Sequence, residues 1–296
     1  MTEILRSLAD LSGRYDAVFC DLWGCLHDGR APFAAAVAAL QGFRQNGGRV
    51  ILLTNAPRPK SSVIRQLDAM GTPRDCWDVI VTSGDAAQMG MLSGAVGHKV
   101  HHIGAPKDEP FFTDFADDLA AYAKTQPSIS RVDLKDAEGL VCTGLADDLT
   151  ETPADYRAAL LMAKTLGLPM LCANPDIVVD MGEHRLYCAG ALAQAYEDMG
   201  GTALYFGKPH PPIYDLARRR LGEVMGHSDP QILCIGDGIG TDIQGGIAEG
   251  LDTLFITGGL EAERFGADVE NPDPVALKRW LEARQMSSTF AMGRLR

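Results

Sequence analysis

The chain has 296 residues, enough for two domains at roughly 150 residues each. Hydrophobic residues make up 46% and charged residues 22%, proportions that fit a globular chain and exclude a disordered tail protein, a collagen-like repeat and a small disulfide scaffold. With 27 basic and 39 acidic side chains the net charge is −12, which argues against a general binder of nucleic acid or of an anionic membrane.

The seven cysteines form no CxxC pair, and four of them lie in apolar runs. Their odd number and their surroundings indicate buried thiols in a reducing compartment. The first residues, MTEILRSLADLSGRYD, carry acids where a secretory signal peptide has a basic region. No apolar run approaches the ~20 residues of a membrane helix. We therefore expect a cytoplasmic protein without a membrane segment.

Short apolar runs alternate with helical patterns from residue 16 onward, which predicts a parallel α/β sheet. The first strands are expected at 16–21, 49–54 and 78–82, with helices at 33–47 and 60–70 and another from residue 83. Gly47 closes the first helix as a C-cap residue.

From about residue 95 the rhythm is less regular and predicts a second α/β group. Its strands are expected at 99–104, 139–144 and 169–174, and its helices at 114–125 and 153–167. The first rhythm then resumes with strands at 202–207 and 231–236, a helix at 211–226, and a strand at 252–257 that is expected to be the last. The sequence thus predicts a doubly wound, Rossmann-like parallel sheet formed by residues 1–87 and 188–296, interrupted by an inserted α/β domain at 88–187. The final SSTFAMGRLR carries three apolar residues that could dock on the rest of the chain.

Polar residues follow four of the expected core strands. They are Asp21, Thr54 with Asn55 behind it, Lys208, and Asp237 with Asp242 five residues on. Each alone is explained by turn or capping chemistry. Ligands of doubly wound sheets bind beyond the carboxyl ends of the strands, so these side chains are expected to meet. Together they predict a site for a metal-bound phosphoryl group.

Phosphoryl transfer needs a nucleophile in line and positive charge over the transferred oxygens. We interpret Asp21 as the nucleophile, which forms an aspartyl-phosphate. Thr54 and Lys208 would hold the phosphoryl oxygens. Asp237 and Asp242 would hold a divalent cation, and hard oxygen ligands favour Mg²⁺. The cation would also keep three neighbouring carboxylates ionised.

Four strings resemble the motifs of the haloacid dehalogenase (HAD) superfamily, in order and at plausible spacing. They are DLWGCLHDG (21–29), TNAPRP (54–59), GKPHPPIYDLA (207–217) and GDGIGTDI (236–243). The large insertion between the second and third strings is where that superfamily places its C2-type cap. The NPD at 174–176 and the GKP at the start of the third string are similar to subfamily IIA, the NagD-like sugar and nucleotide phosphatases. The resemblance implies a HAD-type phosphoric monoester hydrolase.

One position departs from that family. In its phosphatases the residue two after the nucleophile is a second Asp, which protonates the leaving group and later activates water. Here that residue is Trp23. The resemblance implies that its backbone carbonyl still contributes to the metal site, but an indole has no proton to shuttle. Because a general acid–base contributes about 10²–10⁴ in rate, we expect slow turnover of alkyl phosphates and faster turnover of acyl or aryl phosphates.

Two interpretations of the HDG segment stay open. His27 and Asp28 could both rescue the missing step, with His27 as the expected proton donor, or the segment could be a turn with Gly29 at positive φ. Arg58 and Lys60 follow Thr54 closely and could reach a second anionic group on the substrate.

Further candidates lie in the insert. Asn174, Asp176, His184 and Arg185 are expected where a cap would close over the core, and are candidates for substrate selection. His98, His101 and His102 have no Cys or carboxylate at ligand spacing, which favours an exposed strand face over a metal site. The run ARRRLGE (217–223) predicts a solvated basic face.

Two other functions stay open. A dehalogenase would need neither a metal nor the pair Asp237 and Asp242, whose presence counts against it. A metabolite-binding or regulatory protein without turnover is favoured by Trp23 and opposed by the intact nucleophile Asp21. The expected partner is a small phosphorylated substrate rather than nucleic acid or a membrane, and the sequence leaves a homo-oligomer open.

Overall fold

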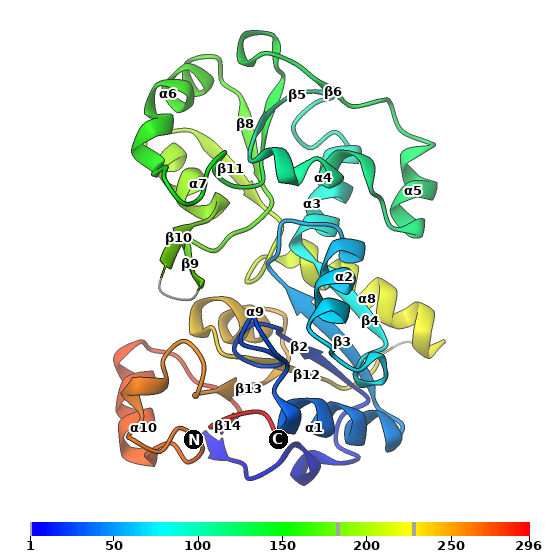
Figure 1. Ribbon diagram of the computed structural model, residues 1–296, viewed down its shortest axis with the longest axis vertical. Helices are drawn as coiled ribbons and strands as arrows, with labels where there is room; N and C mark the ends of the chain where they lie inside the picture. The colour runs from blue at the N-terminus through cyan, green and yellow to red at the C-terminus, as the bar shows by residue number, and fades with distance from the viewer. Residues whose placement is uncertain (1, 182–183, 227–228) are drawn as a thin grey trace. The chain divides into compact units, whose positions relative to one another are not determined.

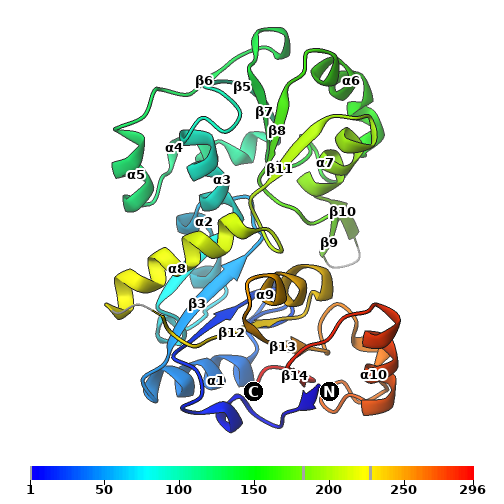
Figure 2. The same ribbon diagram turned by 180° about the vertical axis from the view of Figure 1, so that it is seen from behind.

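The computed structural model describes residues 2–181, 184–226 and 229–296. The chain folds into two compact units (Figures 1 and 2). The first unit contains Met1–Thr54, Arg65–Val81 and Tyr214–Arg296, and the second contains Asn55–Ile64 and Thr82–Ile213.

The first unit is built on a seven-stranded sheet with the order β1-β14-β13-β12-β2-β3-β4. Each pair of neighbouring strands along the sheet from β1 through β3 is parallel, which confirms the predicted doubly wound fold class. Its strands are β1 (Glu3–Ile4), β2 (Ala17–Cys20), β3 (Arg49–Thr54), β4 (Val79–Thr82), β12 (Ile232–Gly236), β13 (Asp252–Ile256) and β14 (Phe290–Met292). The helices in these parts of the chain are α1 (Ala34–Gln45), α2 (Lys60–Ala69), α8 (Pro211–Met225), α9 (Gln244–Ala248) and α10 (Pro274–Ala283).

The sequence explains the central strands and the first helix. All residues of β2 and β12 are buried, as expected for strands of a parallel sheet that is covered on both faces. In α1 the buried side chains recur at helical spacing, at Val37, Leu40 and Phe43 among others. Gly47 follows α1 with φ +94°, a conformation that glycine adopts without a Cβ penalty.

The C-terminal part of the first unit holds elements that the sequence analysis missed. The side chain of Asp273 accepts N–H bonds from Val275 and Ala276 and so caps α10. On α10, the Trp280 ring stacks on Phe255 of β13 with 5.6 Å between the ring centroids. The prediction that 252–257 is the last strand is wrong, because β14 follows it. The C-terminal tail docks as this strand.

The second unit has a five-stranded parallel sheet with the order β11-β8-β7-β5-β6 and a separate antiparallel hairpin, β9 with β10. Its strands are β5 (Lys99–Ile103), β6 (Ser130–Arg131), β7 (Gly139–Cys142), β8 (Pro169–Cys172), β9 (Val178–Met181), β10 (His184–Tyr187) and β11 (Thr202–Tyr205). Its helices are α3 (Ser83–Leu92), α4 (Pro110–Thr113), α5 (Asp117–Ala123), α6 (Arg157–Thr165) and α7 (Ala189–Asp198). Tyr196 of α7 is buried in its core, and its hydroxyl donates to the Leu168 carbonyl at 2.6 Å.

One strand lies in a different sheet from the one expected. The run at 202–207 was predicted to be a core strand, but β11 pairs parallel with β8 in the second unit. An alternating strand-and-helix rhythm indicates parallel strands without showing which sheet a strand joins. The two compact units do not change over at residues 88 and 187. The limits of the inserted domain at these two residues stay a prediction. No helix among the described residues is long and apolar enough to cross a membrane.

Candidate active site

In the first unit, Asp21 and Asp237 come together where two neighbouring strands end. Strands β2 and β12 pair with Cys20 opposite Ile235, and the Asp21 N–H extends this ladder by donating to the Ile235 carbonyl at 2.8 Å. Asp237 directly follows the last residue of β12. On the other side of β2 lies β3, which ends in the half-buried Thr54. The strands therefore bring three of the predicted residues to one edge of the sheet, at the kind of position where α/β sheets bind ligands.

The Asp237 carboxylate lies in a cradle of two glycines. A Cβ built on Gly24 or on Gly259 would lie only 2.0 Å from Asp237 Oδ2. The same oxygen accepts the Leu260 N–H at 2.9 Å. Asp237 is 4% exposed. Since larger residues at these glycines would displace the carboxylate, the local sequence fixes where its oxygens lie.

The thiol of Cys25 completes a group of three potential metal ligands. One donor atom each from Asp21, Cys25 and Asp237 lies within 4.8 Å of the other two, and all three side chains are buried. Burial, followed by the negative charge of Asp237, raises the pKa of the Cys25 thiol well above its usual range. The sequence predicts Cys25 to be a buried thiol, and its closeness to Asp21 along the chain is the signal that points to a further role.

The carboxylates of this group fit a hard divalent cation. Mg²⁺ is bound through one or two carboxylates and keeps several waters, and Asp21 and Asp237 supply two buried carboxylates with neighbouring donor atoms. Two buried like charges disfavour each other's ionised form, and a cation between them removes that penalty.

Asp242 lies outside this group of three. Its Oδ2 accepts the Gly238 N–H at 3.1 Å and the Thr241 hydroxyl at 3.3 Å. A Cβ on Gly236 would lie 2.1 Å from the Asp242 carboxyl carbon, so this side chain packs against the end of β12. The loop here is one turn of π-helix (Ile239–Ile243), a feature that is frequent at functional sites. The role of Asp242 as a metal ligand stays a prediction.

Trp23 and His27 pack on each other with their rings edge to face, 5.7 Å between centroids. His27 is 3% exposed, and its Nδ1 accepts the Gly29 N–H at 3.0 Å. Burial lowers the pKa of His27 to about 4, so the imidazole is neutral near pH 7. Gly29 has φ +85°, and a Cβ there would lie 2.2 Å from the Trp23 ring. The geometry supports the turn interpretation of the HDG segment and argues against His27 as the proton donor.

In the second unit, Asn55 and Lys208 are joined by reciprocal hydrogen bonds although 153 residues separate them. The Lys208 N–H donates to Asn55 Oδ1 at 2.7 Å, and Asn55 Nδ2 donates to the Lys208 carbonyl at 3.1 Å. Asn55 Nδ2 also donates to Asp176 Oδ1 at 2.8 Å, and Asn174 Oδ1 accepts the Asp176 N–H at 3.0 Å. A Cβ on Gly207 would lie 2.5 Å from Asn55 Oδ1, which explains the glycine before the lysine.

The predicted site residues thus fall into two groups. Asp21, Trp23, Thr54, Asp237 and Asp242 belong to the first unit, and Asn55, Arg58, Asn174, Asp176 and Lys208 belong to the second. Within the second unit, burial lowers the pKa of the Arg58 guanidinium, and the charge of Asp108 opposes that shift. Arg185 is exposed on β10, and the side chain of His184 lies outside the described residues.

The histidines of β5 are not an exposed face, contrary to the prediction. His101 and His102 are half-buried. His101 Nδ1 lies 3.1 Å from the Val132 carbonyl, and His102 Nε2 lies 2.9 Å from Thr143 Oγ1. The Thr143 hydroxyl donates to Asp108 Oδ2 at 2.7 Å, so His102 belongs to a hydrogen-bonded network inside the second unit.

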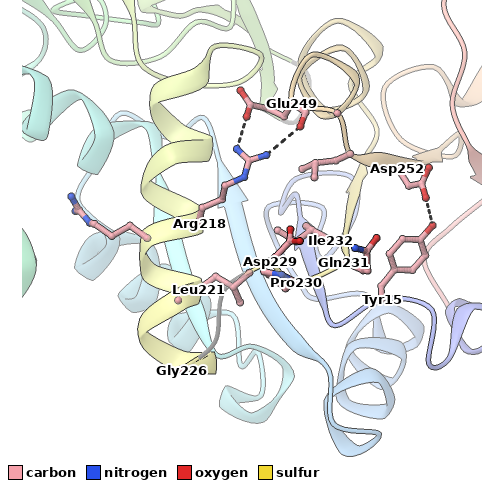
Figure 3. Close-up of a pocket in the computed structure, with 14 residues that line it drawn as sticks. Tyr15, Arg218, Leu221, Gly226, Asp229, Pro230, Gln231, Ile232, Glu249 and Asp252 are labelled. Carbon is pink, nitrogen blue, oxygen red and sulfur yellow. Dashed lines mark hydrogen bonds and ion pairs between the residues drawn. The ribbon is translucent and has the colours of Figure 1, made fainter.

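A cavity of about 920 Å³ lies near the amino ends of β12 and β13 in the first unit, away from Asp237. Figure 3 shows that polar groups lining it bind one another. Arg218 forms an ion pair with Glu249, and the Tyr15 hydroxyl donates to Asp252 at 2.6 Å. In the same helix Arg219 is exposed, but Arg220 is buried and donates to the Ile80 carbonyl at 3.3 Å, so the predicted solvated basic face is wrong at Arg220.

Comparison with known proteins places this site in a family. A family model described as haloacid dehalogenase-like hydrolase matches residues 18–115, and a second, described as HAD-hydrolase-like, matches 205–278. The crystal structure of a haloacid dehalogenase-like family hydrolase from Brucella suis 1330 is 38% identical, covers 99% of this chain and 100% of that chain, and has a TM-score of 0.83. The chain belongs to the haloacid dehalogenase superfamily.

Curated relatives place it in subfamily IIA of that superfamily. The ribonucleotide monophosphatase NagD of Escherichia coli (strain K12) is 24% identical over 83% of this chain and 88% of its own length. The D-glycerol 3-phosphate phosphatase of Mycobacterium tuberculosis is 26% identical over 86% of this chain. The match covers 66% of that protein's length.

Proposed function

We propose that this HAD protein is a Mg²⁺-dependent phosphatase of small phosphorylated metabolites, such as sugar or nucleotide phosphates, which acts through an aspartyl-phosphate on Asp21. The observation that carries the proposal is the buried pair Asp21 and Asp237 at the carboxyl ends of β2 and β12. The relatives described above, which hydrolyse phosphate esters by their names, support the same class of reaction.

In the proposed reaction a carboxylate oxygen of Asp21 attacks the substrate phosphorus, and the bond from phosphorus to the leaving oxygen breaks. Thr54 and Lys208 bind the phosphoryl oxygens during this step. Mg²⁺, held by Asp21, the Trp23 carbonyl, Asp237 and Asp242, supplies positive charge to those oxygens when bound. Water then attacks the phosphorus of the aspartyl-phosphate, which releases phosphate and restores Asp21.

The second unit supplies the proposed substrate contacts. Asn55 binds both the backbone N–H and the backbone carbonyl of Lys208, so it positions the segment that carries the lysine. Arg58, Asn174 and Asp176 are proposed to bind the phosphate or the rest of the substrate. The inserted segment at 88–187 would act as a lid that excludes water and contacts the leaving group.

Trp23 determines the leaving groups that we expect the enzyme to accept. Its indole N–H is not an acid at physiological pH, and the neighbouring His27 is neutral and bonded to Gly29. An alkoxide leaves poorly without a proton, whereas a carboxylate or a phenolate leaves unaided. We therefore expect hydrolysis of acetyl phosphate and p-nitrophenyl phosphate to exceed that of alkyl phosphates.

Restoring the acid tests this interpretation. Trp23→Asp should raise turnover of an alkyl phosphate such as glycerol phosphate by up to about 10²–10⁴, while turnover of acetyl phosphate changes little. Trp23→Asn is the matched control, because it removes the same ring without adding a carboxyl group. An equal effect of both substitutions on both substrates would contradict the proposed role of this position.

A second function has a specific observation in its favour. Because neither Trp23 nor His27 offers a proton, the protein could bind phosphorylated metabolites without releasing phosphate. Such a protein would be stabilised by phosphorylated ligands in thermal unfolding and would release no phosphate from acyl, aryl or alkyl phosphates. Turnover of any of these substrates would exclude it.

A further inference from the structure

The thiol of Cys25 faces the two carboxylates that are proposed to hold Mg²⁺. The chain turns sharply after β2: the Leu26 N–H donates to the Leu22 carbonyl at 2.8 Å, and Gly24 in this turn has φ +76°. The turn brings the Cys25 thiol close to the Asp21 carboxylate. Asp237 reaches the same place from β12, and donor atoms of the three residues lie within 4.8 Å of one another.

The chemistry of these donors differs from that of a site for Mg²⁺ alone. Mg²⁺ and Ca²⁺ are bound by oxygen, whereas Zn²⁺ and Co²⁺ accept thiolate sulfur together with carboxylate oxygen. We propose that Asp21, Cys25 and Asp237 form a binding site for a thiophilic divalent cation of the Zn²⁺ or Co²⁺ class, with Cys25 as the third side-chain ligand. The inference rests on the proposed function only in that it uses two of the same carboxylates.

The spacing suits such a cation after a small contraction. With bonds of about 2.3 Å to sulfur and 2.0–2.2 Å to oxygen, the ligands of a tetrahedral zinc lie roughly 3.5 Å apart. Donor atoms that already lie within 4.8 Å of one another need to approach by about 1.3 Å at most. Binding replaces the S–H bond by a sulfur–metal bond and releases one proton to solvent, with no change of oxidation state.

The site has a consequence for the reaction. A cation bound to Asp21 and Asp237 in this way occupies the two carboxylates that are proposed to hold Mg²⁺, so the two cations cannot bind at the same time. Thiophilic cations are therefore expected to compete with Mg²⁺ and to inhibit the enzyme. Cys25 determines how strongly they do so.

Co²⁺ titration of the metal-free full chain tests the inference without any substrate. Thiolate bound to Co²⁺ gives a charge-transfer absorption band in the near ultraviolet, which oxygen ligands do not give. Cys25→Ser keeps the shape of the side chain and replaces sulfur by oxygen. Cys76→Ser is the matched control, because Cys76 is another buried thiol of the first unit and lies outside the group of three.

The band is expected in the wild type and in Cys76→Ser and is expected to be absent in Cys25→Ser. Zn²⁺ affinity is measured by competition with Co²⁺. Loss of a residue that only supports a metal ligand typically lowers metal affinity by about 10- to 100-fold. Because Cys25 is proposed as a direct ligand, Cys25→Ser should lower the Zn²⁺ affinity by at least this much. The affinity for Mg²⁺ should change little. Cys25→Ala is the second variant if Cys25→Ser fails to fold.

Bound Co²⁺ without the band in the wild type overturns the inference, whatever the variants do. A band that persists in Cys25→Ser, or an unchanged Zn²⁺ affinity in either Cys25 variant, overturns it as well. If Mg²⁺ binds but Co²⁺ gives no band, this inference fails and the metal dependence of the proposed function still stands. If neither Mg²⁺ nor Co²⁺ binds, the inference and the metal dependence of the proposed function both fail.

Discussion

Replacing Gly24 by alanine should lower metal-dependent activity by displacing a single carboxylate oxygen of Asp237. A Cβ on Gly24 would lie 2.0 Å from Asp237 Oδ2, and Cβ atoms essentially never approach another heavy atom closer than 3.0 Å. The oxygen must therefore move by about 1 Å. A misplacement of about 1 Å in an active site can lower the rate by roughly 10²-fold, which is the loss that we expect in Mg²⁺-dependent hydrolysis of p-nitrophenyl phosphate.

Gly13→Ala is the matched control for this substitution. Gly24 and Gly13 have φ of +76° and +77°, but a Cβ on Gly13 would meet nothing within 4 Å. Alanine in this left-handed conformation costs about 1–2 kcal/mol, so each variant should lose at least this much stability in chemical denaturation. Only Gly24→Ala should also lose Mg²⁺ affinity in calorimetric titration. Wild-type turnover and Mg²⁺ affinity in Gly24→Ala would refute the assignment of Asp237 to the metal site.

Three further outcomes are expected. Asn55→Ala removes the acceptor of the buried Lys208 N–H and should destabilise the protein by about 1–3 kcal/mol in urea unfolding; an unchanged midpoint would contradict the role of this pair. Trp280→Ala should cost about 3–5 kcal/mol in the same assay, because the ring packs on Phe255 in the core, and a loss below about 1 kcal/mol would mean that α10 is not part of that core. Burial lowers the pKa of His102 below the ordinary 6.5. The unfolded chain therefore binds a proton at this imidazole more tightly than the folded chain does. As the pH drops below 6.5, protonation of His102 favours unfolding and the stability of the protein falls. Between about pH 7 and pH 5 the wild type should therefore lose more stability than His102→Gln, and equal losses would contradict the shift.

Local patterns predicted most strands and helices of the fold because they carry short-range signals. The run RVILLT became β3 with the expected bounds, and the apolar spacing of 33–47 became α1. The sheet to which a strand belongs is a long-range property. The strand at 202–205 pairs with β8, and nothing in its own sequence distinguishes that partner from one in the other sheet.

The part of the candidate site that directly follows buried strands could be predicted from the sequence. Asp21 and Asp237 were expected to meet because they follow buried strands, and the structure places them together. Cys25 was missed as part of the group because a thiol buried beside Asp21 looks like packing. The bonds between Asn55 and Lys208 depend on a backbone approach that only the folded chain reveals.

The measurement that tests the central claim most directly is peptide mass mapping after rapid acid quench during turnover of p-nitrophenyl phosphate. The account predicts one added phosphoryl group on the peptide that contains Asp21, formed with Mg²⁺ and absent with EDTA or in Asp21→Asn. Sustained phosphate release without phosphorylation of Asp21, or at the wild-type rate in Asp21→Asn, would contradict it.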